Sequence, residues 1–218
     1  FTGSDPVTIL GGNDTATLTT GCYRYTLAAT DNVGNQGSTQ TIVKVDTSAP
    51  TAPSLALSNL SANAFYAAGT LYIRPSAAGT FRVTAASTDA DSGVASYAFG
   101  SLNTDGGANF GGSQTGAQFD YTFDGTTTAP GTARTATATN PAGGVSTTGS
   151  YSIAEDTTGP TTSLTDPGAN LRGTVGLTAT ASDGGAGVVS VEFQRSPAGA
   201  GTWTSITTDT TPGGGVTA

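Results

Sequence analysis

Short runs in which hydrophobic and polar residues alternate recur along the whole chain, and glycine, proline, asparagine and aspartate gather between them. Alternation with a period of two predicts β-strands, and the residues between the runs are those that tight turns require. The threonine, valine, tyrosine and phenylalanine of the runs pack well across strands. Helix formers are scarce, with one lysine, Lys44, and two glutamates, Glu155 and Glu192. The pattern predicts an all-β protein with almost no helix.

One pattern of strand, turn and strand occurs twice. Residues 79–99 (GTFRVTAASTDADSGVASYAF) align without gaps on residues 173–193 (GTVGLTATASDGGAGVVSVEF), and 9 of the 21 positions are identical. The identities include Asp89 and Asp183 in the turn and Phe99 and Phe193 in the second run. Each copy predicts two strands joined as a β-arch or as a hairpin.

A second repeat marks a boundary. The segment 46–50 (DTSAP) matches the segment 156–160 (DTTGP), 110 residues further along the chain. Before each boundary lies a strand, a polar turn and another strand, in residues 23–45 and again in residues 132–153. One unit therefore holds about seven short strands in roughly 100 residues, which is typical of an immunoglobulin-like sandwich.

The quoted stretches resemble bacterial Ig-like repeats. The resemblance is carried by residues 22–35 (CYRYTLAATDNVGN), by Asp156–Pro160 and by residues 183–193, followed by Thr202–Thr204. Such repeats occur in tandem in large secreted and surface-anchored proteins, so the resemblance implies a bacterial protein that is secreted or at the cell surface. In similar repeats the cysteine at the place of Cys22 has a partner in the preceding strand, before the position of Phe1.

These observations predict tandem immunoglobulin-like β-sandwiches, one complete and two partial. Residues 1–46 hold the later strands of one repeat, residues 47–156 a complete repeat, and residues 157–218 the early strands of another. Two explanations are open. The chain is a window cut from a longer array, or it is a subunit built out of phase, in which the tail of one copy completes the head of the next by strand addition.

Composition excludes several classes of function. The chain has no histidine and a single cysteine, so it lacks the imidazole of a serine or cysteine hydrolase and the ligands of a zinc site. We therefore expect no enzyme. A net charge of −8 gives no basic field for nucleic acid. No window approaches the length of a membrane span.

Two acidic pairs are candidate sites. Asp89 and Asp91, followed by Gly93, place carboxylates at alternate positions and could present oxygens to Ca²⁺; the alternative is a turn in which they accept hydrogen bonds from backbone amides. We expect no other cofactor. Asp120 and Asp124 flank aromatic residues on a strand, where alternation predicts that both acids lie on its solvated face rather than in a catalytic site.

The remaining candidates concern binding and modification. We expect Trp203 to lie in a sandwich core rather than to form a carbohydrate-binding platform, and Lys44 to face solvent rather than to form a Lys–Asn cross-link. Residues 103–118 (NTDGGANFGGSQTGAQ) are predicted to be an irregular, glycine-rich insert and the best place for a ligand site. Asn13 and Asn59 match the glycosylation pattern, and Thr126–Thr128 could carry O-linked glycans.

The sequence thus predicts a structural extracellular protein that serves as a stalk, spacer or filament subunit. Its expected partners are neighbouring repeats or copies of itself. The alternative from another class is an adhesin or carbohydrate-binding module whose loops at the end of a sandwich hold a host or glycan ligand.

Overall fold

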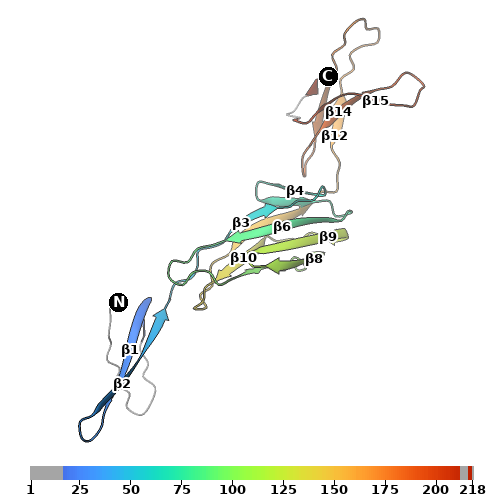
Figure 1. The fold of residues 1–218 in the computed structure, drawn as a ribbon. Helices are drawn as coiled ribbons and strands as arrows, with labels where there is room; N and C mark the ends of the chain where they lie inside the picture. The colour runs from blue at the N-terminus through green and yellow to red at the C-terminus, as the bar shows by residue number, and fades with distance from the viewer. Residues whose placement is uncertain (1–16, 212–215, 218) are drawn as a thin grey trace.

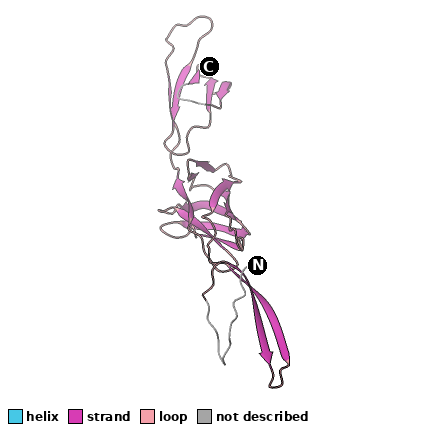
Figure 2. Ribbon diagram, turned by 90° about the vertical axis from the view of Figure 1, so that its left-hand side faces the viewer, coloured by secondary structure: helices cyan, strands magenta, loops and turns pink. Residues whose placement is uncertain are grey.

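The computed structural model describes residues 17–211 and 216–217. These residues form sixteen strands in five sheets and no helix, so the expectation of an all-β protein is confirmed for them. The strands group into three bodies that follow one another along the molecule: a hairpin, a central unit and a last unit (Figure 1). Loops and turns connect the strands throughout, as Figure 2 shows.

The first body is a long antiparallel hairpin made of β1 (Gly21–Thr30) and β2 (Gln36–Val45). Its turn is fixed by Asp31, whose carboxylate accepts hydrogen bonds from the amides of Val33 (2.9 Å) and Asn35 (2.8 Å). Gly34 supplies the positive φ of 91° that the turn requires. The alternating runs before Asp46 therefore form the expected pair of strands.

The central unit consists of two sheets. One has the order β3-β6-β9-β8 and is antiparallel; the other has the order β4-β5-β11-β10-β7, in which β5 and β11 run parallel. The strands are β3 (Ser54–Ser58), β4 (Ala64–Ala67), β5 (Thr70–Ile73), β6 (Gly79–Ala86), β7 (Ser96–Phe99), β8 (Ala108–Thr115), β9 (Gln118–Thr128), β10 (Arg134–Thr139) and β11 (Gly149–Glu155).

One hydrophobic core joins these two sheets. It is built by buried residues of both sheets and of one loop, namely Leu71, Ile73, Phe81, Val83, Leu102, Phe110, Tyr121, Phe123, Tyr151 and Ile153. The ring of Phe81 stacks on Tyr121 with centroids 4.9 Å apart and lies 6.5 Å from Phe123. Because aromatic side chains bury the most apolar surface, this cluster is the main source of the unit's stability.

The repeated pattern of strand, turn and strand is a β-arch in both copies. In the central unit β6 and β7 lie in different sheets, so the chain crosses the core between them. In the last unit the counterparts β13 (Thr178–Ser182) and β14 (Val191–Arg195) also lie in different sheets. The alternative that the sequence allowed, in which the two strands pair with each other as a hairpin, does not occur in either copy.

The last unit has a small core. Its other strands are β12 (Thr161–Leu164), β15 (Thr204–Asp209) and β16 (Val216–Thr217), arranged as the sheets β12-β13-β16 and β14-β15. Its buried hydrophobic residues are Ala179 and Phe193, and Leu177 and Val191 pack against them. Within the described residues of this unit, Leu164 (59% exposed) and Ile206 (46% exposed) remain open to solvent.

Two expectations about aromatic residues are wrong. Trp203 is 68% exposed, because it precedes β15 in a unit whose core is small and does not reach it. The segment 103–118 is not an irregular insert, because half of it is strand β8, paired with β9. Phe110, at its centre, is buried in the core instead of facing a ligand.

Hydrogen bonds hold the short loop that precedes β8. The side-chain amide of Asn103 donates to the carbonyl oxygen of Phe110 (2.8 Å), and the amide of Phe110 donates to Asn103 Oδ1 (2.9 Å). The buried guanidinium of Arg134 donates to the carbonyl of Ser101 (3.0 Å) and to the carboxylate of Asp105 (2.7 Å). The hydrogen bond from Arg134, together with one from the hydroxyl of Thr132 (2.9 Å), lowers the pKa of Asp105.

The core of the central unit generates a stability prediction. Replacing Phe81, which is 1% exposed, by alanine should lower the free energy of unfolding by about 3–5 kcal/mol, because it leaves a cavity between the sheets. The matched control is Phe65→Ala, at a residue of the same unit that is 47% exposed, and we expect a loss of less than about 1 kcal/mol. Equal losses in urea unfolding would contradict this assignment of the core.

Candidate functional site

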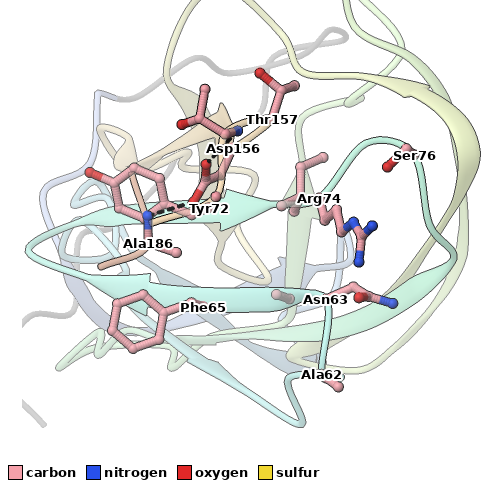
Figure 3. Close-up of a pocket in the computed structure, with 13 residues that line it drawn as sticks. Ala62, Asn63, Phe65, Tyr72, Arg74, Ser76, Asp156, Thr157 and Ala186 are labelled. Carbon is pink, nitrogen blue, oxygen red and sulfur yellow. Dashed lines mark hydrogen bonds between the residues drawn. The ribbon is translucent and has the colours of Figure 1, made fainter. Parts of the chain in front are cut away.

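Two cavities among the described residues lie at the two junctions between bodies. The cavity beyond the central unit has a volume of about 650 Å³ and lies between β4, β5 and the segment 156–159 (Figure 3). The cavity before the central unit has a volume of about 550 Å³ and lies between the ends of β1 and β2 and the turns at 91–92 and 141–142. Each cavity contains the aspartate of the repeated boundary motif.

Asp156 connects the central unit to the last unit. Its backbone amide donates a hydrogen bond to the carbonyl oxygen of Ile73 in β5 (2.8 Å). Its carboxylate oxygen Oδ2 accepts a hydrogen bond from the amide of Ala186 (2.7 Å), which lies in the arch turn of the last unit. One residue therefore contacts both units, and Figure 3 shows the bond to Ala186 at the edge of the cavity.

Asp46 makes the equivalent contact one unit earlier. Its Oδ2 accepts a short hydrogen bond from the hydroxyl of Ser92, in the arch turn of the central unit. In the gapless alignment of the two arches, Ser92 and Ala186 are the same position. Both boundary aspartates thus bind the same point of the arch turn that follows them, although the donor is a hydroxyl in one case and a backbone amide in the other.

Asn140 reinforces the first junction. Its side chain is 2% exposed, and its amide nitrogen donates to Asp46 Oδ2 (2.9 Å), to the carbonyl of Ser48 (2.9 Å) and to Asp89 Oδ2 (3.2 Å). Its amide oxygen accepts a hydrogen bond from the amide of Gly144 (2.7 Å). The turn between β10 and β11 is thereby fastened to the linker and to the arch.

The structure places the two predicted calcium ligands in this network. Asp89 Oδ1 accepts hydrogen bonds from the amides of Asp91 (3.1 Å), Ser92 (3.0 Å) and Gly93 (3.3 Å), and Asp91 Oδ2 accepts one from the hydroxyl of Ser48 (2.9 Å). Within residues 17–211 and 216–217, no group of three or more acidic, histidine or cysteine side chains is arranged to hold a metal ion. The Ca²⁺ site at Asp89 and Asp91 stays a prediction.

The arch of the last unit repeats the same turn. Asp183 Oδ2 accepts hydrogen bonds from the amides of Gly185 (3.0 Å) and Gly187 (2.8 Å), which align with Asp91 and Gly93. The shared aspartate therefore has the same structural role in both copies: it accepts amide hydrogen bonds and fixes the turn at which the chain passes from one sheet to the other.

The second acidic pair lies on an outer face, as alternation predicts. Tyr121 and Phe123 are buried, whereas Asp120 accepts two hydrogen bonds from the guanidinium of Arg82 (2.6 and 2.8 Å). This ion pair lowers the pKa of Asp120. Asp124 accepts hydrogen bonds from the amide and hydroxyl of Thr126 (both 2.8 Å).

Among the other sequence candidates, Thr127 is 2% exposed, so the expectation of an O-linked glycan is wrong at that position, whereas Lys44 and Asn59 are exposed. Lys44 is exposed as expected, and it lies opposite Cys22 in the hairpin; Cys22 forms no disulfide within the described residues. Asn59 is exposed and has a positive φ of 51°. Asn13 lies outside the described residues.

Sequence reasoning missed an aromatic group in the larger cavity. The rings of Phe65 in β4 and Tyr72 in β5 lie at one end of the cavity, and the side chains of Asn63 and Arg74 lie at the other (Figure 3). Phe65 and Tyr72 are directly opposite each other in the antiparallel pair of β4 and β5. The alternation in residues 64–73 could have indicated this shared face, because cross-strand partners point to the same side of a sheet.

Comparison with known proteins gives no relative: no family model, no curated protein and no solved structure matches the chain. In the part of the chain that the structure describes, no helix has the length and apolar character to cross a membrane.

The junction generates a prediction about ionisation. Hydrogen bonds from the hydroxyls of Ser92 and Ser48 lower the pKa of Asp46 below 3.8. Removing the larger cause in Ser92→Ala should raise this pKa toward its ordinary value, as measured from the carboxyl carbon shift of Asp46 by NMR. Ser101→Ala, in a loop that does not contact Asp46, is the matched control and should leave the pKa unchanged.

The direction of the pKa shift of Asp46 determines how the stability of the fold depends on pH. A carboxylate whose pKa is lower in the folded protein than in the unfolded chain stabilises the fold above the unfolded pKa, near 3.8. This stabilisation is lost as the pH falls through the folded pKa. If Asp46 titrated at or above 3.8 in the unsubstituted protein, the proposed hydrogen bonds would be contradicted.

Proposed function

We propose that the chain is part of a bacterial extracellular structural protein, in which immunoglobulin-like sandwiches are linked in series as a stalk, spacer or filament. The observation that carries the proposal is the repeated junction. Asp46 and Asp156 bind equivalent points of successive arch turns, so the same contact orients each unit on the one before it. A contact that recurs once per repeat is what a linear array requires.

The linkers support the same role. Pro50 and Pro53, at the first boundary, are buried, and Pro160 stands at the second boundary. Proline restricts the backbone, so short linkers that contain it act as stiff spacers. The net charge of −8 on the whole chain opposes lateral aggregation of such an array.

A secreted or cell-surface location belongs to the same proposal. It rests on the resemblance to bacterial Ig-like repeats and on a composition without histidine or methionine and with a single cysteine. A protein of this kind needs no catalytic groups, so we propose no enzymatic activity.

A rod-like arrangement can be tested by X-ray scattering in dilute solution. A compact protein of this length would have a radius of gyration of about 17 Å, and we expect a clearly larger value for the 218-residue chain. The double variant Asp46→Ala, Asp156→Ala should bend more freely at both junctions and give a broader distribution of interatomic distances. Asp166→Ala, at an aspartate outside both junctions, is the matched control. A compact particle of about 17 Å would contradict the proposal.

A second candidate function is glycan binding at the larger junction cavity. The exposed ring of Phe65, its neighbour Tyr72 and the guanidinium of Arg74 line a space of about 650 Å³ at one end of the central sandwich. Aromatic faces stack on the apolar faces of sugar rings, and planar polar groups bind their hydroxyls or carboxylates. This arrangement favours an adhesin that carries its site between units.

Glycan-array binding distinguishes this second candidate. Binding that falls at least about tenfold in Phe65→Ala and in Tyr72→Ala, and persists in Leu164→Ala at an exposed residue of the last unit, would support it. No binding by the unsubstituted chain, or binding that neither aromatic substitution changes, would contradict it.

A further inference from the structure

The hairpin at one end of the molecule and the last unit at the other are counterparts of complementary parts of the central unit. The turn of the hairpin has the same hydrogen bonds as the turn between β10 and β11: the amide of Asp31 donates to the carbonyl of Asn35, and the amide of Asn140 donates to that of Gly144. Both turns also contain a glycine with φ near 90°, at positions 34 and 143. Strands β1 and β2 therefore correspond to β10 and β11.

The last unit corresponds to the strands against which β10 and β11 lie. Its strands β12, β13 and β14 are the counterparts of β3, β6 and β7 by the two sequence repeats. In the central unit β10 pairs with β7. The start of β11 lies against β3, so that a Cβ on Gly149 would be 3.4 Å from the side chain of Leu55.

We propose that the hairpin of one copy of this chain completes the last unit of a second copy by adding β1 to the edge of β14. The inference rests on the proposed structural role, because it names the partner through which such a protein extends. The hairpin and the last unit lie at opposite ends of the molecule (Figure 1), so the contact joins different copies. Head-to-tail contacts of this kind generate a linear polymer unless the rotation between copies closes a ring.

The last unit has a groove at the required place. It has a volume of about 370 Å³ and is lined by β12, β13 and β14 but not by β15. Leu164, Leu177 and Phe193 contribute its apolar surface. Their counterparts Leu55, Val83 and Phe99 all pack in the core of the central unit. Strand β14 is hydrogen-bonded to β15 on one edge and to no other described strand.

The hairpin carries a matching apolar face. Leu27 is 50% exposed, whereas its counterpart Ala136 in β10 is 1% exposed; Val43 is 38% exposed, whereas its counterpart Ile153 in β11 is 6% exposed. Side chains that the central unit buries are thus replaced in the hairpin by apolar side chains open to solvent. Covering them is favourable in proportion to the area removed from water.

The central unit also supplies the register. There Ala136 lies opposite Phe99, and Thr137 lies opposite Ala98, in antiparallel strands. In the proposed contact, β1 of one copy would pair with β14 of the next in the same register. Leu27 would then lie opposite Phe193, Ala28 opposite Glu192 and Ala29 opposite Val191. Thr39 is the counterpart of Gly149. In the central unit a Cβ on Gly149 would lie 2.0 Å from the carbonyl oxygen of Pro53. Because Thr39 has a Cβ, β2 has to lie farther from β12 than β11 lies from β3.

Disulfide trapping tests the register in the full chain. In a Cys22→Ser background, mild oxidation of the double variant Ala28→Cys, Glu192→Cys should give a ladder of covalent oligomers on non-reducing gels. The off-register control Ala28→Cys, Ser196→Cys places the second thiol four residues away, about 13 Å along the strand, and should give no ladder. An equal ladder in both variants, or a disulfide within single chains, would overturn the register.

Sedimentation without cross-linking tests the contact itself. The unsubstituted chain should show oligomers that grow with concentration, and Leu27→Lys should remove them. Thr26→Lys, on the opposite face of the same strand, is the matched control and should leave them unchanged. If the unsubstituted chain stays monomeric at all concentrations, another segment fills the groove and the inference is wrong. The proposed rod would still stand, because scattering from dilute single chains measures it independently.

Discussion

The rest of the structure depends on the hydrogen bonds by which a single aspartate fixes each arch turn. In both copies the carboxylate, of Asp89 or of Asp183, accepts hydrogen bonds from amides two and four residues further along the chain. This turn sends consecutive strands into different sheets. A chain that divides its early strands between two layers can bury both inner faces only when later strands complete the layers. The central unit has these later strands, and a core with several aromatic residues forms there.

Much of the local structure is predictable from the sequence, because turn chemistry and alternation are local signals. The two strands and the turn of residues 21–45, the order of strand, turn and strand in the repeated segments, and the solvated face of Asp120 all follow from them. Whether a turn forms an arch or a hairpin is not local, because it depends on which distant strand pairs with each partner. The same limit explains the errors at Trp203 and Phe110. The local preference of an aromatic residue is the same whether distant strands cover it or leave it exposed, and glycines do not prevent β8 from pairing with β9.

Only part of the candidate site could be predicted from the sequence. The boundary motif marked Asp46 and Asp156, and the repeat marked the turns at Asp89 and Asp183, but nothing in either pattern showed that the boundary aspartates bind the turns. These contacts span 46 and 30 residues and use different donors, a hydroxyl and an amide. A search for sequence patterns compares residue types. What the two junctions share is instead the position in space of a hydrogen-bond donor.

The scarcity of charge determines how successive units are held together. The ion pairs of Arg82 with Asp120 and of Arg134 with Asp105 both lie inside the central unit. The junctions instead use carboxylates that accept hydrogen bonds from amides and hydroxyls, and such bonds are short-ranged and specific in direction. Surface ion pairs are weakened by salt, whereas these contacts require only that the carboxylate stay ionised. With 7 basic residues against 15 acidic ones, orientation by amide and hydroxyl donors is a way to align units that does not depend on a cation for each aspartate.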